Sequence, residues 1–493
     1  MILPNANLKI LSRSLANQSD VEYALAETDA GLHLVVCAPA ESPALNDFEG
    51  QHTELSDHTL IVSSLNPASA AALRSHLSWL QPRPLGLNIS AGMGDRIGLA
   101  TPGHVRAVRA TGSSISPIFA QQSIREMTRT QRTPQQVMDD ATWGIFQEGW
   151  QAGAGADADH LKTPEDIDAC LTAGYSFFTI DPGAHVDNRA ETADLAALRE
   201  LAGMLPDQIR PDKSGLSGRD FDVEGLKIHF DEFTLTKAAV KYGRAIEHVS
   251  SMYHHLDRTA GQHPFELEVS VDETEQPTSH AEHIYIASEL ERLGVRWVSL
   301  APRYVGSFEK GVDYIGDISA FERDFAGHAA IARHFGPYKL SLHSGSDKFS
   351  IYPITARLTH GLVHLKTAGT SYLEALRTIA AVDVNLFREI YLFARERYET
   401  DKVSYHVSAE LDGAPLPEDV HDCTTLLDQF DARQILHIAF GSVLTGRVAD
   451  GNYRFRDRFI SMLRDHAEMY ANNLERHFIR HLKPFVESSD EYE

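Results

Sequence analysis

The chain has 493 residues, of which 43% are hydrophobic and 23% charged, proportions typical of a folded globular protein and unlike those of a disordered chain. Its 45 Lys and Arg residues against 69 Asp and Glu residues give a formal charge of −24, which repels phosphate backbones and anionic lipid headgroups. These values argue against nucleic acid and membrane surfaces as partners.

Three cysteines, Cys37, Cys170 and Cys423, are scattered without the spacing of a disulfide framework or a zinc site. The first residues lack the apolar core and cleavage site of a secretory signal, and no apolar run is long enough to span a bilayer. A reducing compartment explains unpaired cysteines, so these features together predict a cytoplasmic protein. They do not predict an oligomeric state.

Residues 1–84 are interpreted as an N-terminal addition, and from residue 85 short β-rich runs alternate with helical patterns. The eight candidate strands are Leu85–Ile89, Ser116–Ala120, Ala156–Leu161, Ser176–Asp181, Phe265–Val271, Trp297–Leu300, Lys339–His343 and Leu362–Lys366. The helical patterns between or after them are Pro102–Ala110, Pro134–Glu148, Ala281–Leu293, Ala320–Phe335, Tyr352–His360 and Tyr372–Ala381. Eight strands joined by helical crossovers predict an α/β fold, a (β/α)8 barrel of the TIM type. A doubly wound open sheet is the alternative.

Two segments interrupt or extend the predicted barrel, which spans residues 85–384. Residues 184–263, after the fourth strand, are too long for a loop and contain a helical stretch at Glu232–Arg258, so they predict an inserted subdomain. Residues 385–493 predict a helical C-terminal extension.

The fifth candidate strand alternates strictly between apolar and polar residues. Because a strand has a period of two, one face carries only apolar side chains and the other carries Glu266, Glu268, Ser270 and Asp272. The apolar face is expected to pack on the outer helices, which points the carboxylates into the barrel. A buried carboxylate is costly without a partner, so a metal, a Lys or a substrate is expected opposite. The alternative is the solvated face of an edge strand.

Other strands end in polar residues that supply such partners. These are Asp159, His160 and Lys162 after the third strand, Asp181 after the fourth, His343 on the seventh, and His364 and Lys366 on the eighth. Active sites of such barrels lie at the C-terminal ends of the strands, so the barrel would bring these residues together. A single His on a strand is ordinarily a core or surface residue, but three at three strand ends favour a metal site. No nucleotide-binding glycine motif or serine-hydrolase motif is present, so no nicotinamide is expected.

Six segments in order are similar to the tagaturonate epimerase family: Ala156–Lys162, Phe178–Gly183, Glu268–Thr274, Ser299–Arg303, Phe308–Tyr314 and Leu342–Phe349. The likeness runs from about residue 85 to beyond residue 440. It implies an isomerase that interconverts D-tagaturonate and D-fructuronate in hexuronate catabolism with one divalent metal, whose identity among Zn, Mn, Ni, Co and Fe is left open. A class II-type aldolase on a related keto acid and a non-catalytic sugar-acid sensor are the alternatives.

The Asp159-His160 pair also resembles that of the class II aldolases, in which the His binds metal and the Asp moves a proton. That likeness implies His160, His343 and His364 as metal ligands. The two sugar acids differ at carbon 4, which is not adjacent to the ketone at carbon 2, so cleavage and re-formation of the bond between carbons 3 and 4 is the expected route. Asp159 and Glu268 are the predicted acid/base groups, with Glu266 as a substitute. The predicted substrate-binding residues are Lys162, Asp181, Arg303, Lys348 and Lys366.

Overall fold

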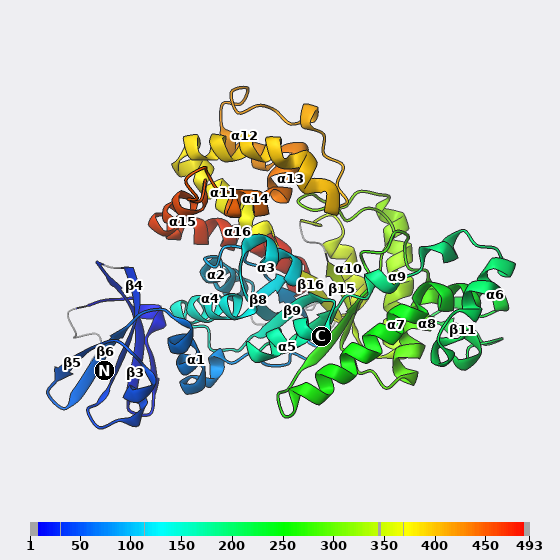
Figure 1. Cartoon of the computed structure of the whole chain (residues 1–493), viewed down its shortest axis with the longest axis horizontal. Coiled ribbons are helices and arrows are strands. Elements are labelled where there is room, and N and C mark those ends of the chain that lie inside the picture. Colours follow the sequence, from blue (N-terminus) through cyan, green and yellow to red (C-terminus); the bar gives the residue numbers. More distant parts are fainter. Residues whose placement is uncertain (1–7, 30, 113, 344–346, 368, 488–493) are drawn as a thin grey trace.

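The computed structural model describes residues 8–487 apart from positions 30, 113, 344–346 and 368, and its central feature is a closed barrel of eight parallel strands (Figure 1). In chain order these are β7 (Ser90–Gly92), β8 (Ser116–Ser123), β9 (Gly155–Leu161), β10 (Phe177–Ile180), β13 (Glu266–Ser270), β14 (Ser299–Ala301), β15 (Lys339–His343) and β16 (Val363–Lys366). The last strand pairs with the first, His364 beside Ser90, which closes the sheet. The predicted (β/α)8 barrel is therefore confirmed, and the open sheet is excluded.

Helices follow the barrel strands and cover the outside of the barrel, and six of them match the helical patterns that the sequence predicted. They are α2 (Thr101–Thr111), α3 (Ile124–Thr130), α4 (Pro134–Gln147), α5 (Pro164–Thr172), α8 (His280–Arg292), α9 (Ile318–Phe335), α10 (Tyr352–Thr359) and α11 (Thr370–Val382). Their starts follow from local chemistry. Thr163 caps α5 through the backbone N–H of Asp166, and the Asp166 carboxylate accepts from the N–H of Thr163. This capping box occupies N–H groups that a helix start would otherwise leave unpaired.

The first barrel strand lies five residues later than predicted. The run from Leu85 to Ile89 is a turn with Gly86 at φ +62°, and β7 begins at Ser90. The backbone N–H groups of Leu85 and Gly86 donate to the Glu266 carboxylate instead of to a neighbouring strand. Leu85 of this run packs with Ile118 and Phe177 at the N-terminal end of the barrel, whereas Leu87 is 40% exposed.

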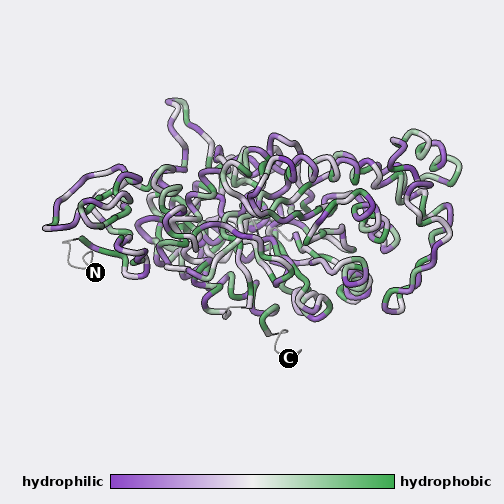
Figure 2. Tube along the Cα trace, turned by 90° about the horizontal axis from the view of Figure 1, so that it is seen from below, coloured by the Kyte–Doolittle hydropathy of each residue, from purple (hydrophilic) through white to green (hydrophobic). Residues whose placement is uncertain are grey.

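Two segments lie at opposite ends of the elongated molecule, with the barrel between them (Figure 1). At one end an antiparallel sheet contains β1 (Lys9–Ile10), β2 (Ala16–Gln18), β3 (Val21–Thr28), β4 (Gly31–Pro39), β5 (Gln51–Leu55) and β6 (His58–Ser63), followed by α1 (Pro67–His76). At the other end, between β10 and β13, lie α6 (Leu195–Gly203), β11 (Asp220–Val223) and β12 (Leu226–His229). The helix that follows them, α7 (Glu232–Ala260), packs against α5 and α8 of the barrel. Hydrophilic residues are spread along the whole trace and do not gather in one segment (Figure 2).

The residues after the barrel are mainly helical. They form α12 (Val384–Asp401), α13 (Phe430–Ile438), α14 (Phe440–Thr445), α15 (Arg456–Asp465) and α16 (Ala467–Glu487). Helix α16 packs against α2 and α11, so the end of the described chain is anchored on the barrel. Among the described helices, none combines the length and the apolar character required to cross a bilayer.

Candidate active site

A buried ammonium group lies among three carboxylates inside the barrel. Lys366 Nζ, on β16, is 2.7 Å from Asp159 Oδ1, 2.9 Å from Asp157 Oδ2 and 3.0 Å from Glu268 Oε1. All four side chains are almost fully buried, with at most 4% exposure. They come from three strands, β9, β13 and β16, so only the closed barrel brings them together.

Two imidazoles lie above this group, each held by one of its carboxylates. His160 Nδ1 is 2.7 Å from Asp159 Oδ1, and His343 Nε2 is 2.6 Å from Glu268 Oε1. The two rings are 5.0 Å apart between centroids. Their other nitrogens face Asp272 Oδ1, at 3.7 Å from His160 Nε2 and 3.3 Å from His343 Nδ1. His160, Asp272 and His343 therefore converge on one point.

The backbone at His160 is unusual for a residue with a side chain. Its φ of +54° lies in the left-handed region, which costs energy for any residue except glycine. This conformation occurs next to the last residue of β9, where it directs the imidazole toward Asp272 and His343. Such strain persists where the surroundings enforce it, and here two carboxylates surround the ring.

Charges control the protonation of these groups. Burial alone would raise the pKa of Asp159, but the cationic forms of His160 and Lys366 outweigh burial and hold that pKa well below its usual range. Burial would likewise raise the pKa of Glu268, and Lys366 and His343 hold it low. Asp157 differs, because burial there prevails over Lys366 and raises the pKa to about 7.

The residues present fit a divalent cation. Asp157, Asp159, Glu268 and Asp272 bring four carboxylates against the one ammonium of Lys366. Nearby carboxylates raise the pKa of His160 and of His343 against the effect of burial, so protonated imidazoles balance this charge, and a divalent cation would supply the same positive charge in their place. His160 Nε2 is buried with no hydrogen-bond partner in the part of the chain that the structure describes. Two imidazoles and one carboxylate are a common ligand set for a transition metal, and the second nitrogen of each imidazole bears the carboxylate partner typical of such ligands.

Two residues predicted for this site lie elsewhere in the barrel. His364 is two residues before Lys366, about 6.6 Å down the strand. Its Nδ1 is 2.8 Å from Ser90 Oγ, and its ring lies against Phe177. Glu266 is likewise two residues before Glu268, and its carboxylate accepts from the backbone at the N-terminal end of the barrel. Strand periodicity identified the correct face for both, but both lie one layer too deep.

A cleft of about 350 Å³ opens beside His343 and Asp272. Arg125, Arg303 and Lys310 line it, together with residues 404–406 from the C-terminal extension. A small recess continues from it to Asp159, His160 and Lys366 and shares Arg125, Lys310 and Tyr405 with the cleft. Cationic side chains therefore surround the route to the two imidazoles.

The predicted substrate-binding residues have different positions. Arg303 lines the cleft, and its Nε is buried without a partner among the described residues. Lys366 borders the recess, with its ammonium held by the carboxylates. Lys162 pairs with Asp181 at 3.2 Å, and neither lines the cleft or the recess. Lys348 is fully buried, and its Nζ donates to the backbone carbonyls of Glu309 and Val312.

Three residues at the cleft were not predicted as functional. Asp272 was on the identified polar face of the fifth strand, but it lies just beyond the strand end. Lys310 lies in the loop after β14, and its ammonium makes no ion pair or hydrogen bond with the described residues, whereas Arg125 pairs with Glu273 at 2.8 Å. No local signal in the sequence distinguishes Lys310 from a solvated charge in a polar loop.

The fold is a TIM-type barrel. At the C-terminal ends of its strands lie two imidazoles, each hydrogen-bonded to a carboxylate, and a cationic cleft. These features define a barrel enzyme for a small anionic substrate. The model of the tagaturonate epimerase family matches residues 11–485. A tagaturonate/fructuronate epimerase of Thermotoga maritima is 42% identical over 477 residues, 96% of each chain.

Solved structures agree with this match. Native and glycerol-complexed structures of fructuronate-tagaturonate epimerase from Cohnella laeviribosi superpose with a TM-score of 0.91 at 37% identity. Each match covers 98% of this chain. It covers 98% of the native structure's chain and 97% of the glycerol-complexed structure's chain. This chain belongs to the tagaturonate epimerase family and is an isomerase. The predicted family is thereby confirmed.

Proposed function

We propose that this enzyme interconverts D-tagaturonate and D-fructuronate by inverting carbon 4. The observation that carries the proposal is the convergence of His160, Asp272 and His343 beside a cleft lined with cationic side chains, in a chain of this family. A uronate supplies what such a cleft selects, since it has one carboxylate and several hydroxyl groups. The cytoplasmic location, and the division of the chain at residues 84 and 384, are part of the same proposal.

One divalent cation would be held by His160 Nε2, His343 Nδ1 and Asp272 Oδ1. When bound, it would act as a Lewis acid that polarises the ketone and its neighbouring hydroxyl group. Asp159 and Glu268 would orient the two imidazoles through their second nitrogens, and Lys366 would hold both carboxylates in place. The identity of the metal does not follow from this ligand set.

Asp159 is the group to which we assign proton transfer at the carbon 4 hydroxyl, because it borders the recess whereas Glu268 lies behind His343. It accepts the hydroxyl proton as the bond between carbons 3 and 4 breaks. The bond electrons pass toward the carbon 2 oxygen, which leaves an enediolate and a three-carbon aldehyde acid. The aldehyde turns, carbon 3 adds to its other face, and the resulting carbon 4 alkoxide takes the proton back from Asp159.

Lys310 and Arg303 are the residues we assign to the substrate carboxylate. Both line the cleft, and the buried Nε of Arg303 has no partner in the described chain. Lys348 would contribute indirectly, because it donates to the carbonyls of Glu309 and Val312 and so holds the loop that carries Lys310. Retention of the carboxylate would keep the aldehyde fragment bound while it turns.

The test is conversion of D-tagaturonate by metal-depleted full-length protein, before and after addition of Zn, Mn, Ni, Co or Fe, with products resolved by chromatography. Fructuronate should form only in reloaded samples, and the reverse reaction should yield tagaturonate. Absence of the epimer with every metal would contradict the proposal. Accumulation of three-carbon fragments without epimer would identify an aldolase.

The same reaction in D₂O tests the bond that breaks. Carbon 4 keeps its own hydrogen when it becomes an aldehyde carbon, so the product should contain no deuterium there. Hydride transfer would also retain the hydrogen, so the protein must be shown to release no nicotinamide on denaturation. Deuterium at carbon 4 would exclude cleavage between carbons 3 and 4 while leaving the epimerase intact.

A further inference from the structure

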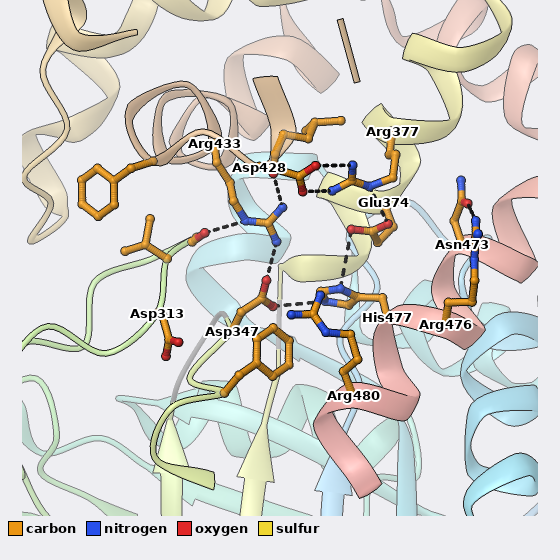
Figure 3. Close-up of a pocket in the computed structure, with 15 residues that line it drawn as sticks. Asp313, Asp347, Glu374, Arg377, Asp428, Arg433, Asn473, Arg476, His477 and Arg480 are labelled. Atoms are coloured by element: carbon orange, nitrogen blue, oxygen red, sulfur yellow. Dashed lines mark hydrogen bonds and ion pairs between the residues drawn. The ribbon is translucent and has the colours of Figure 1, made fainter. Parts of the chain in front are cut away.

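A second cluster of metal-ligating side chains lies outside the barrel mouth, beside a cleft of about 530 Å³ between α11, α13 and α16 (Figure 3). Its members are Asp347, after β15, and His477 and His481, one turn apart on α16. They are 8%, 5% and 0% exposed, respectively. An i, i+4 pair of histidines presents both imidazoles on one face of a helix, the spacing that helical zinc sites use.

Three atoms of this cluster form a nearly equilateral triangle. Asp347 Oδ1 is 3.2 Å from His477 Nε2 and 3.1 Å from His481 Nε2, and the two nitrogens are 3.1 Å apart. Ligand atoms of a tetrahedral zinc ion, each about 2.0 Å from the metal, lie about 3.3 Å apart. The triangle therefore has the size of one face of such a site.

Hydrogen bonds alone leave this triangle incomplete. A carboxylate supplies no hydrogen and each imidazole nitrogen supplies at most one, so two hydrogens at most serve three close contacts. If both histidines donate to Asp347, nothing lies between the two nitrogens. A cation at the centre satisfies all three atoms at once.

The outer atoms of the cluster already have partners that would orient such ligands. Tyr352 Oη is 2.9 Å from His481 Nδ1, and Glu374 Oε1 is 3.6 Å from His477 Nδ1. Arg433 donates to the other oxygen of Asp347 at 2.6 Å (Figure 3). Metal-bound histidines ordinarily have their second nitrogen held in this way.

From these contacts we propose that Asp347, His477 and His481 form a second site for a divalent transition metal of the zinc type, with a structural role. Asp347 and His477 line the 530 Å³ cleft, so water from the cleft would complete the coordination of the metal. The metal would tie α16 to Asp347, which stands four residues after His343 in the sequence.

Metal content per chain tests this proposal. The full-length chain without affinity-tag histidines, loaded with zinc and dialysed, should hold two zinc ions by elemental analysis. His481→Ala and His160→Ala should each hold one, from different sites, and the double variant should hold none. The matched control is His421→Ala, which removes an exposed imidazole outside both clusters and should retain two. Equal zinc content in wild type and His481→Ala would overturn the proposal, whatever His160→Ala shows.

Two further measurements cover a variant that fails to fold. Tyr352→Phe keeps the ring but removes the hydroxyl group at His481, so zinc affinity at this site should fall about 10–100-fold. Crystals of the wild-type chain grown with zinc should show an anomalous-difference peak inside the Asp347–His477–His481 triangle. Crystals with a peak at the barrel mouth and none here would show that the cluster is only a hydrogen-bonded trio.

Discussion

Asp159 contacts three polar side chains of the barrel mouth. Its Oδ1 meets both His160 and Lys366, and its Oδ2 accepts from Gln121 Nε2 at 3.3 Å. Because it also borders the recess, it can reach substrate while remaining held. At the scale of single residues, Asp159 and Asp157 have the same side chain and differ in position. Asp157 lies deeper on the same strand and does not border the recess.

Asp159→Asn should lower kcat on the order of 10²–10⁴-fold with a much smaller change in KM, since the amide keeps the shape but accepts no proton. Steady-state kinetics on the metal-loaded enzyme measure this. The control is Asp181→Asn, which changes a carboxylate at the end of the next strand that lines neither cleft nor recess. An unchanged kcat in Asp159→Asn would remove that residue from proton transfer.

Lys310→Met should raise KM for the uronate by about 10–100-fold, because a charge-assisted hydrogen bond to a carboxylate contributes about 1.5–3 kcal/mol. The kcat should change less, since the ammonium binds both epimers alike. Lys162→Met provides the comparison, because Lys162 pairs with Asp181 away from the cleft. If Lys162→Met raised KM and Lys310→Met did not, the carboxylate site would be misplaced.

At the scale of elements, α2, α11 and α16 share a contact that contains a buried histidine. His104 of α2 places Nε2 2.8 Å from Ser371 Oγ of α11, and its ring centroid lies 4.4 Å from that of Phe478 of α16. The side chain is fully buried. Burial lowers the pKa of His104 to about 4, against the opposing pull of Asp95.

This contact predicts a loss of stability in acid. Between pH 6.5 and about 4 the unfolded chain binds a proton at His104 that the folded chain does not, so the free energy of unfolding falls as the pH falls. The contribution is on the order of 3 kcal/mol over that window. Urea unfolding at a series of pH values gives the slope of the unfolding free energy against pH. In His104→Gln this slope should be shallower by the uptake of about one proton. His421→Gln should leave the slope unchanged, and an equal slope in His104→Gln would contradict the assignment.

At the scale of the whole molecule, the C-terminal extension completes the site. Residues 404–406, after α12, line the cleft together with His343, and α16 brings His477 and His481 to Asp347. Activity and global stability are therefore expected to be linked through metal.

Chelation should abolish turnover and lower the melting temperature, and a divalent transition metal should restore both. A ligand that binds only the folded state stabilises it by about 4 kcal/mol at 1,000 times its Kd. Calorimetry over a metal titration measures the rise in melting temperature. This rise should be smaller in His160→Ala than in the wild type, and equal to that of the wild type in His421→Ala. Full activity and an unchanged melting temperature in a verified metal-free sample would contradict metal dependence.

The sequence by itself determined the barrel and the strand faces. Apolar runs, helix caps such as Thr163 and the alternation on the fifth strand are local signals, and each reports on its own element. Seven of the eight strand positions agree closely with prediction for this reason. Only the first is shifted, because apolar residues that close the end of a barrel have the same composition as a strand.

Only the tertiary structure decided which polar residues meet. The period of a strand identifies the face on which a residue lies but not its depth in the barrel. His364 and Glu266 were therefore predicted at the barrel mouth, although each lies one layer deeper than Lys366 and Glu268, respectively. Asp272 and Lys310 lie beyond strand ends, where the direction of a side chain depends on how the loop packs. Tertiary structure also decides the contact of Asp347 with His477 and His481. Asp347 precedes both histidines by more than 120 residues, and they meet because α16 folds back onto the barrel.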